Sequence, residues 1–513
     1  MSFDPAHPPC EPLSGQDVPS FAYTTFSRRL PAIVTKIVDD VYRTYHALDS
    51  QDQATSEKVK EAKKIIEMIA GLRYEMQRDK PFRPLTDNDP DVEEWNANLA
   101  KYYPTSSWFK ASWLFAECYL YRRVREAFAL STHWRDYDPF FEQKQSVFKS
   151  SQKAVLAIAT RLMAAVSSGD GEGTKRSALD ILVQGGRTSA GTREAFLEMA
   201  EMCLWGNATD LSLLVEADTA KLEHLQKRMI SGGISSSNGN NSSQQQSPTA
   251  SPKEGEQKSS TIDKETLEEF GTSDKILSND LDKLWDRLQH IEQGRVDIIL
   301  DNAGFELYVD LVFADFLVRA GFASKVVFHC KSIPWFVSDV MQSDFHWTLE
   351  QLVKTGDDAF FKPEDSLEQQ ALQELGRRWQ TYAAQGTWIV QENPFWTSCF
   401  AFWHLPTEPS AKALFDDMAK ADLWVFKGDL NYRKLVYDCK WPTTTPFLEA
   451  IGPLASKEQG LNMPSLVTFR TCKADVVVGL APGVAERVQA KSPDWMVNGE
   501  YAVISFSQGS RQA

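Results

Sequence analysis

The sequence lacks the features of a secreted, membrane-spanning or nucleic-acid-binding protein. Its seven cysteines are scattered and never spaced as CxxC, which favours reduced thiols in an intracellular compartment. No apolar stretch reaches the roughly 18 residues that a membrane span needs, and the N-terminus resembles no secretory signal. No basic block is present, and 70 acidic against 55 basic residues give a net charge of −15. Because nucleic-acid binding depends on neutralising phosphates, we do not expect this chain to bind nucleic acid. We expect a soluble cytoplasmic protein, with a nuclear presence left open.

Several catalytic signatures are missing as well. The eight histidines form no HExxH or HxxxH pair, so a zinc hydrolase is not expected. There is no GxSxG nucleophile turn. The Gly-rich stretch at Gly169–Gly173 follows a helix-like segment rather than a strand, so it is interpreted as a charged loop and not as a nucleotide site.

Length and composition place the chain among globular proteins of more than one domain. Its 513 residues allow two to four domains, and the apolar fraction of 42% is close to the globular average. Residues 1–230 are expected to form an α-helical N-terminal region. Residues 231–260 are dominated by Ser, Asn and Gln and are expected to be a disordered insertion. Residues 261–513 are then expected to form an α/β domain.

The helical expectation rests on apolar spacing. In Ser56–Met76, apolar residues recur every three or four positions, which is typical of an amphipathic helix. Ser107–Ala129 is apolar on nearly all sides and is expected to be a buried helix. Glu117 and Arg122 inside it would need partners if buried, so either could face a cleft. A further helix is expected to start at Ser273 or Asp274 and to include apolar residues up to Ile291.

From Val296 the pattern changes to short apolar runs. VDIIL at Val296, a helix ending at Gly321 and KVVFHC at Lys325 form a βαβ unit. Four more runs are candidate strands: Leu423–Phe426, Leu466–Phe469, Asp475–Leu480 and Ala502–Phe506. Runs that are apolar on both faces favour parallel strands covered by helices. The predicted fold class is therefore α/β, a doubly wound and mostly parallel sheet with an α-helical N-terminal region.

Polar residues follow the first two predicted strands. Ligands of an open parallel sheet bind beyond the carboxyl ends of its strands. Asp301 and Asn302 follow the first strand, and Asp339 follows the second. Three hard oxygen ligands from neighbouring strand ends suit Mg²⁺ or Mn²⁺ and leave coordination positions for water and a phosphate oxygen. The sequence thus indicates a candidate metal site.

Cations follow the later strands. Arg433, Lys473 and Arg470 could hold a phosphate, an arginine by bidentate hydrogen bonds. Each residue also has an ordinary interpretation, since one Asp after a strand is commonly a helix cap and one Arg is commonly a surface cation. Glu306 and Asp310, on the helix after the first strand, are expected to be solvated or capping. The joint arrangement at the strand ends is what points to a site.

Four motifs resemble a known family. They are DNAGFE at 301–306, SIPWFVSD at 332–339, KGDLNYRKL at 427–435 and RTCKA at 470–474. They resemble the metal-dependent damage-control phosphatases, in the subfamily defined by an RTxK motif. The likeness extends over nearly the whole chain except residues 231–260 and the extreme ends. The resemblance implies a helical N-terminal region packed on an α/β domain that holds one divalent metal.

The resemblance also implies roles for individual residues. Asp301, Asn302 and Asp339 correspond to the metal ligands and catalytic residues. The implied substrate contacts are Asp301, Asn302, Asp429, Leu430, Asn431, Tyr432, Arg433 and Lys473, with Glu117 and Arg470 as further candidates. The implied activity is hydrolysis of phosphorylated sugars such as fructose 1-phosphate and fructose 6-phosphate. Mn²⁺ is the expected metal, with Co²⁺, Ni²⁺ or Mg²⁺ as alternatives.

Two other functions remain open at this point. The family resemblance also carries an S-adenosylmethionine-dependent protein-glutamate O-methyltransferase, although no Gly-rich strand–turn–helix motif with a following acidic residue is present. A non-catalytic helical scaffold that uses the insertion to bind partners is the third hypothesis. The attacking group, a metal-bound water or a carboxylate such as Asp301, is also open. The sequence gives no indication of the oligomeric state.

Overall fold

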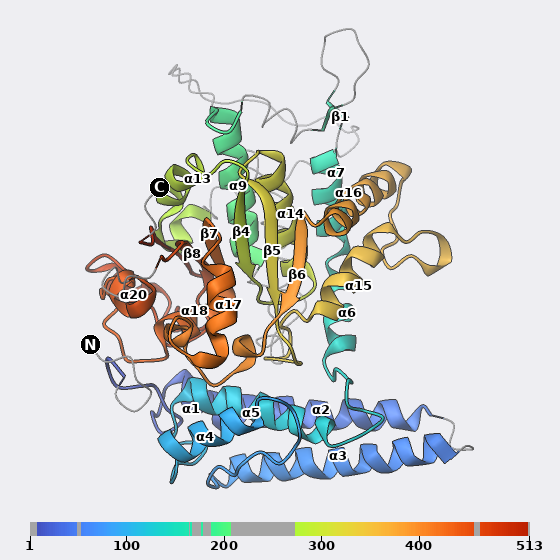
Figure 1. Cartoon of the computed structure of the whole chain (residues 1–513), viewed down its shortest axis with the longest axis vertical. Helices are drawn as coiled ribbons and strands as arrows, with labels where there is room; N and C mark the ends of the chain where they lie inside the picture. Colours follow the sequence, from blue (N-terminus) through green and yellow to red (C-terminus); the bar gives the residue numbers. More distant parts are fainter. Residues whose placement is uncertain are drawn as a thin grey trace, which may run out of the picture.

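The computed structural model describes residues 8–48, 53–163, 165–166, 176–177, 186–206, 272–455 and 462–510. The predicted insertion at 231–260 lies outside these residues, as do the predicted domain boundaries at 230 and 260. Figure 1 shows two parts, a layer of helices formed by α1 to α5 and an α/β part built around one sheet. None of the described helices is long and apolar enough to cross a membrane.

The helical layer comes from the first 129 residues. Its elements are α1 (Phe21–Thr24), the π-helix η1 (Thr25–Arg29), α2 (Leu30–His46), α3 (Gln53–Gln77), α4 (Val92–Tyr102) and α5 (Trp113–Ala129). The helix predicted over Ser56–Met76 lies within α3, whose apolar stripe of Ile65, Ile69 and Leu72 is buried. Nearly every residue of α5 is buried, as its all-round apolar sequence predicts.

The α/β part contains a seven-stranded sheet. Its strands are β3 (Ile276–Asn279), β4 (Gly294–Ile299), β5 (Ala323–Cys330), β6 (Trp388–Glu392), β7 (Leu423–Lys427), β8 (Ser465–Thr471) and β9 (Ala502–Ser507). The strand order is β3-β9-β8-β7-β4-β5-β6. The five strands from β8 to β6 are mutually parallel, and β9 pairs antiparallel with β8. This confirms the predicted α/β, mostly parallel fold class. The two-residue strands β1 (Ala165–Val166) and β2 (Arg176–Ser177) form a separate antiparallel pair.

The helices of the α/β part come from both halves of the chain. They are α6 (Phe141–Ser150), α7 (Gln152–Met163), α9 (Ala190–Gly206), α13 (Leu281–Leu288), α14 (Phe305–Arg319), α15 (Gln342–Val353), α16 (Ser366–Gln385), α17 (Lys412–Met418), α18 (Gly428–Val436), α19 (Phe447–Ala450) and α20 (Val484–Lys491). Here α9 packs on α14, and α7 packs on α16. One apolar core joins the helical layer to α18, and a second surrounds α14.

Two local predictions are wrong. The helix predicted from Ser273 or Asp274 is a 3₁₀ turn, then strand β3, then α13. Here Ile276 pairs with β9, and Asn279 accepts a hydrogen bond from the Leu281 N–H, which separates strand from helix. The apolar run at Asp475–Leu480 is a buried loop rather than a strand, because its N–H groups bond to loop carbonyls and to a tyrosine hydroxyl.

Candidate active site between the sheet and the helical layer

The ends of β4 and β5 bring the three predicted metal ligands together. Asp301 and Asn302 follow β4 after one intervening residue, while Asp339 lies in the loop after β5 and forms a backbone bridge with Asn302. The Val340 N–H donates to the Asp301 carbonyl at 2.8 Å, and the Ala303 N–H donates to the Ser338 carbonyl at 2.7 Å. All three ligand candidates are at least 95% buried and line one cavity. Backbone pairing therefore holds them in place.

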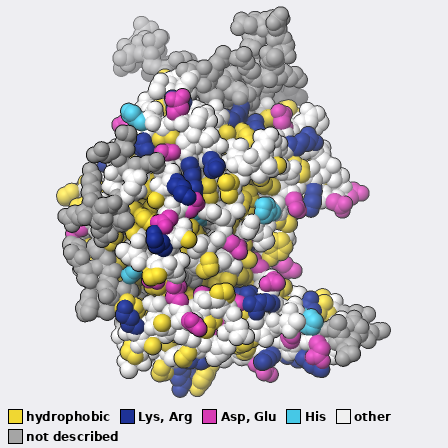
Figure 2. Space-filling view, viewed as in Figure 1, with side chains coloured by type: hydrophobic (Ala, Val, Ile, Leu, Met, Phe, Trp, Pro, Cys, Tyr) yellow, Lys and Arg dark blue, Asp and Glu magenta, His cyan; other side chains and the backbone are white. Residues whose placement is uncertain are grey.

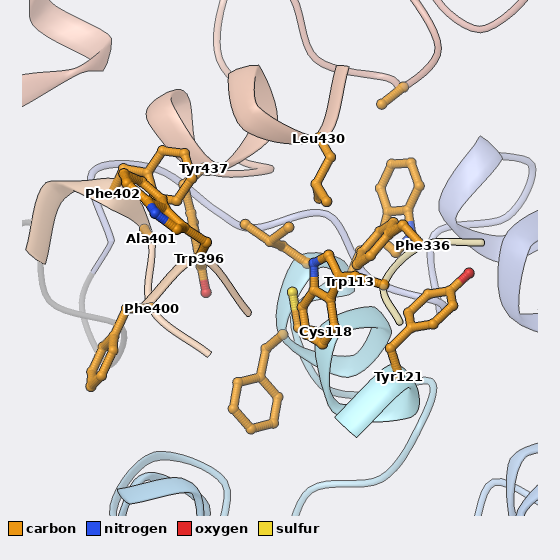
Figure 3. Packing of buried hydrophobic residues seen from close by; sticks show 14 of the residues in the cluster. Trp113, Cys118, Tyr121, Phe336, Trp396, Phe400, Ala401, Phe402, Leu430 and Tyr437 are labelled. Atoms are coloured by element: carbon orange, nitrogen blue, oxygen red, sulfur yellow. The ribbon is translucent and has the colours of Figure 1, made fainter. Parts of the chain in front are cut away.

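The loop that carries Asp339 has an unusual backbone. Phe336 and Val337 have φ angles of 42° and 73°, a left-handed conformation that is costly for bulky and β-branched side chains. The Phe336 ring stacks on Tyr121 of α5 with ring centroids 4.6 Å apart, and Figure 3 shows the two rings side by side. The helical layer thus holds the strained loop that positions Asp339.

The cavity lies between the two parts of the molecule. The helical layer contributes Arg29, Ile33, Trp113, Glu117 and Tyr121 to its lining. The α/β part contributes Asp301, Asn302, Phe336, Asp339, Asp429, Leu430, Arg433 and Lys473. In Figure 3, Leu430 of α18 points toward Trp113 of α5. In the space-filling view the outline is notched on one side, where the helical layer meets the α/β part (Figure 2).

Arg433 is held by two carboxylates at the edge of this cavity. Its guanidinium contacts Asp438 at 2.6 Å and Glu117 at 2.9 Å, and it lies over the Trp113 ring at 4.0 Å. Burial raises the pKa of Glu117 above its usual value, although the charge of Arg433 opposes this shift. The contact joins α5 to α18. Arg433 is therefore fixed in position before any ligand binds.

Asp429 organises the segment that contains Lys473. Its Oδ1 accepts hydrogen bonds from Arg470 Nε at 2.8 Å and from the Lys473 N–H at 3.1 Å. Arg470 is fully buried, lies 4.3 Å from the centre of the Tyr432 ring and is not part of the cavity lining. Lys473 does line the cavity. Arg470 thus holds Asp429 in place without lining the cavity itself.

The five residues predicted as substrate contacts at 429–433 do not all face the cavity, because they lie on different faces of helix α18. Asp429, Leu430 and Arg433 line the cavity, as positions i, i+1 and i+4 of α18 can do together. Asn431 instead donates to the carbonyl oxygens of Leu300 at 3.1 Å and Lys427 at 2.7 Å. The Tyr432 hydroxyl accepts a hydrogen bond from the Val478 N–H at 3.0 Å. These two side chains anchor α18 to the sheet and to the 475–480 loop.

Comparison with known proteins identifies the family. The family model described as damage-control phosphatase ARMT1-like domain matches residues 25–243 and 249–488. The damage-control phosphatase ARMT1 of Danio rerio is 35% identical over 98% of each chain. The human protein of that name is 34% identical over 96% of this chain and 98% of its own. This chain belongs to the damage-control phosphatase ARMT1-like family.

Membership in the damage-control phosphatase family confirms the resemblance seen in the four motifs. The ARMT1 protein of Xenopus tropicalis, at 36% identity, likewise aligns over 98% of this chain and 99% of its own. A crystal structure of a DUF89 family protein from Pyrococcus horikoshii covers 96% of this chain at 13% identity, with a TM-score of 0.38. Both the identity and the TM-score of this match are low. The family is established by the sequence relatives.

In this damage-control phosphatase family member, the prediction that Glu306 and Asp310 are solvated or capping is wrong. Both are buried around Lys427, whose Nζ lies 3.5 Å from Glu306 Oε1 and 3.0 Å from Asp310 Oδ1. Burial raises the pKa of Asp310 to about 7, although Lys427 lowers it. Burial lowers the pKa of Lys427, but the neighbouring acidic groups, Asp310 first, raise it above its usual value. The two carboxylates are buried because α14 is covered by α9.

Other residues of this family member's cavity were not predicted as site residues. Lys331, directly after β5, is not part of the cavity lining but forms an ion pair with Asp339 at 3.0 Å, and its place at a strand end was the signal available. Arg29, Ile33, Trp113 and Tyr121 come from the helical layer, and nothing in their local sequence indicates a site. Arg29 ends the π-helix η1, and such turns recur at functional sites.

The donor chemistry of the three ligand candidates is distinctive. Among the described residues, no group of three or more His, Cys, Asp and Glu side chains is arranged to hold a metal ion. The predicted set has two carboxylates and one carboxamide, Asn302, so it falls outside that pattern. Its donors are all oxygens, which is the preference of Mg²⁺ and Mn²⁺. The set therefore fits a hard divalent cation rather than zinc.

Proposed function

We propose that this chain hydrolyses phosphate monoesters of sugars, such as fructose 1-phosphate and fructose 6-phosphate, and requires one divalent cation. The observation that carries the proposal is the cavity in which Asp301, Asn302 and Asp339 lie with Lys473 and other cationic side chains. Acidic oxygen donors beside cations suit a metal and a phosphate together. The sugar class follows from the motif resemblance, and family membership supports phosphatase chemistry.

The charge balance of the site favours a divalent cation. Asp301 and Asp339 bring two negative charges, and Lys331 lies on Asp339 at 3.0 Å and offsets one of them. Buried charge is costly unless it is balanced. Asn302 adds a donor oxygen without adding charge. We propose Mn²⁺ as the cation, with Co²⁺, Ni²⁺ and Mg²⁺ as alternatives.

The residues that line the cavity suggest how phosphate ester hydrolysis would proceed. A bound divalent cation would supply Lewis-acid stabilisation of charge on the phosphoryl group. Lys473, Arg29 and Arg433 line the cavity and would bind the phosphoryl oxygens by charge-assisted hydrogen bonds. Glu117 lines the cavity and accepts a hydrogen bond from Arg433 at 2.9 Å, so it would keep that guanidinium in place for the phosphoryl group.

The proposal is tested by phosphate release from fructose 1-phosphate and fructose 6-phosphate. We expect chelator-treated protein to lose activity by roughly 100-fold and added Mn²⁺ to restore it, because charge stabilisation at the phosphoryl group is lost with the metal. Co²⁺, Ni²⁺ and Mg²⁺ are compared in parallel at the same concentration. Unchanged turnover in the chelated protein would contradict the metal requirement. A metal-loaded protein that releases phosphate from neither ester would contradict the substrate class.

A further inference from the structure

Glu306 is a buried carboxylate with a specific neighbour. It lies in the first turn of α14, is fully buried, and its Oε2 accepts a hydrogen bond from Asn302 Nδ2 at 2.7 Å. Burying a carboxylate costs free energy unless a cation and hydrogen bonds compensate. Lys427 provides part of this compensation at 3.5 Å. The N-terminal end of α14 also favours a negative charge.

The hydrogen bonds around Asn302 fix which way its carboxamide points. The two hydrogens of Nδ2 go to Asp301 Oδ2 at 3.0 Å and to Glu306 Oε2 at 2.7 Å. Oδ1 accepts a hydrogen bond from the Ser338 hydroxyl at 2.5 Å. A carboxamide turned over would set its oxygen against two carboxylates and its nitrogen toward the Ser338 side. Oδ1 keeps a second lone pair for another ligand.

Lys427 and Asp310 hold Glu306 in this position. Lys427 extends from the end of β7, contacts Glu306 and Asp310, and donates to the Cys203 carbonyl of α9. The Cys203 thiol in turn donates to Asp310 Oδ1 at 3.2 Å. The network therefore ties β7, α9 and α14 together behind the cavity. Glu306 is its member that reaches Asn302, whereas Asp310 lies one turn further along the same helix.

We propose that Glu306 is a positioning residue that orients the Asn302 carboxamide so that its oxygen can serve a divalent cation. The inference rests on the proposed function, in which Asn302 is one of the oxygen donors. Carboxylates that orient a metal ligand commonly change metal affinity by about 10–100-fold when they are removed. Glu306 thus acts through Asn302 and is not itself part of the cavity lining.

The test is calorimetric titration of Mn²⁺ alone into the full chain. We expect Glu306→Met to weaken Mn²⁺ binding by about 10–100-fold, because Asn302 Nδ2 loses an acceptor and the carboxamide can turn over. Glu306→Gln keeps the side-chain volume and one acceptor oxygen, so we expect it to recover part of the affinity. Circular dichroism establishes that each variant is folded.

Asp310→Asn is the matched control. Like Glu306→Gln, it replaces a carboxyl group of α14 that contacts Lys427 by a carboxamide, but Asp310 does not contact Asn302. We expect its Mn²⁺ affinity to stay close to that of the wild type. If Asp310→Asn weakens binding as much as Glu306→Met does, or if both Glu306 variants bind as the wild type does, the positioning role is wrong. Wild-type protein that binds no Mn²⁺ would instead overturn the proposed function, and this inference with it.

Discussion

Asp301→Ala and Asp339→Ala are each expected to lower kcat/KM for fructose 1-phosphate on the order of 10³-fold in the presence of Mn²⁺. The two carboxylates are buried close together after the ends of β4 and β5. Because they are buried, no other carboxylate can take the place of the one that is removed. Losing one removes a charged donor from a set of three. The measurement is steady-state phosphate release, scaled to the folded fraction found by circular dichroism.

Asp297→Ala is the matched control for both variants. Asp297 is a fully buried carboxylate in the middle of β4, where it contacts Arg295 at 2.6 Å and His329 at 3.0 Å. Its removal also leaves buried partners uncompensated, but it is not part of the cavity lining. We expect Asp297→Ala to lose stability and to keep its turnover per folded molecule. Wild-type-like turnover in Asp301→Ala and Asp339→Ala would show that the site is elsewhere.

Buried strands could be predicted from the sequence, whereas edge strands could not. VDIIL, KVVFHC, LWVF and LVTF became β4, β5, β7 and β8, the four strands at the centre of the sheet, because strands covered on both faces are apolar throughout. Strands β3 and β6 lie at the two edges, where Ser278 and Gln391 are only partly buried. Their mixed composition gives no comparable signal. An apolar run alone also cannot separate a strand from the buried loop at 475–480.

The ligand candidates could be predicted because they depend on topology alone. Residues that follow neighbouring parallel strands meet at one edge of the sheet, so Asp301 and Asp339 come together whatever else the fold contains. Which carboxylates hold each cationic side chain could not be predicted, because these partners lie far apart in the sequence. Arg433 is fixed by Glu117, 316 residues away, whereas Lys473 lines the cavity beside it. The buried network of Glu306 is hidden for the same reason.

Helix phase resolves which charged residue of α5 belongs to the site. The sequence left open whether Glu117 or Arg122 faces a cleft, and only Glu117 was a candidate site residue. Five residues correspond to about 140° around a helix, so the two side chains leave α5 on different faces. Glu117 reaches the cavity, while Arg122 is buried against Asp87 and Asp91. One side of α5 therefore serves the site, and another holds the helical layer together.

Arg122→Met is accordingly expected to destabilise the protein by roughly 3–5 kcal/mol while leaving the chemistry of the folded enzyme largely intact. Arg122 forms paired hydrogen bonds with Asp87, both at 2.9 Å, and with Asp91 at 2.8 and 2.9 Å. Its removal leaves the buried Asp87 carboxylate without its cation. The measurement is urea unfolding of the full chain, followed by circular dichroism, together with turnover at a temperature where the variant is folded.

Two further variants test why Arg122→Met loses stability. Arg43→Met removes an arginine that is solvent-exposed and lies 3.8 Å from the buried Asp40. Because this arginine is solvated, we expect its loss to cost less than about 1 kcal/mol. Arg122→Met combined with Asp87→Asn removes the stranded charge, so we expect it to regain part of the lost stability. An Arg122→Met variant no less stable than Arg43→Met would refute the structural role of this pair. A stable variant that had lost turnover would place Arg122 in the catalytic machinery and contradict the separation of the two faces of α5.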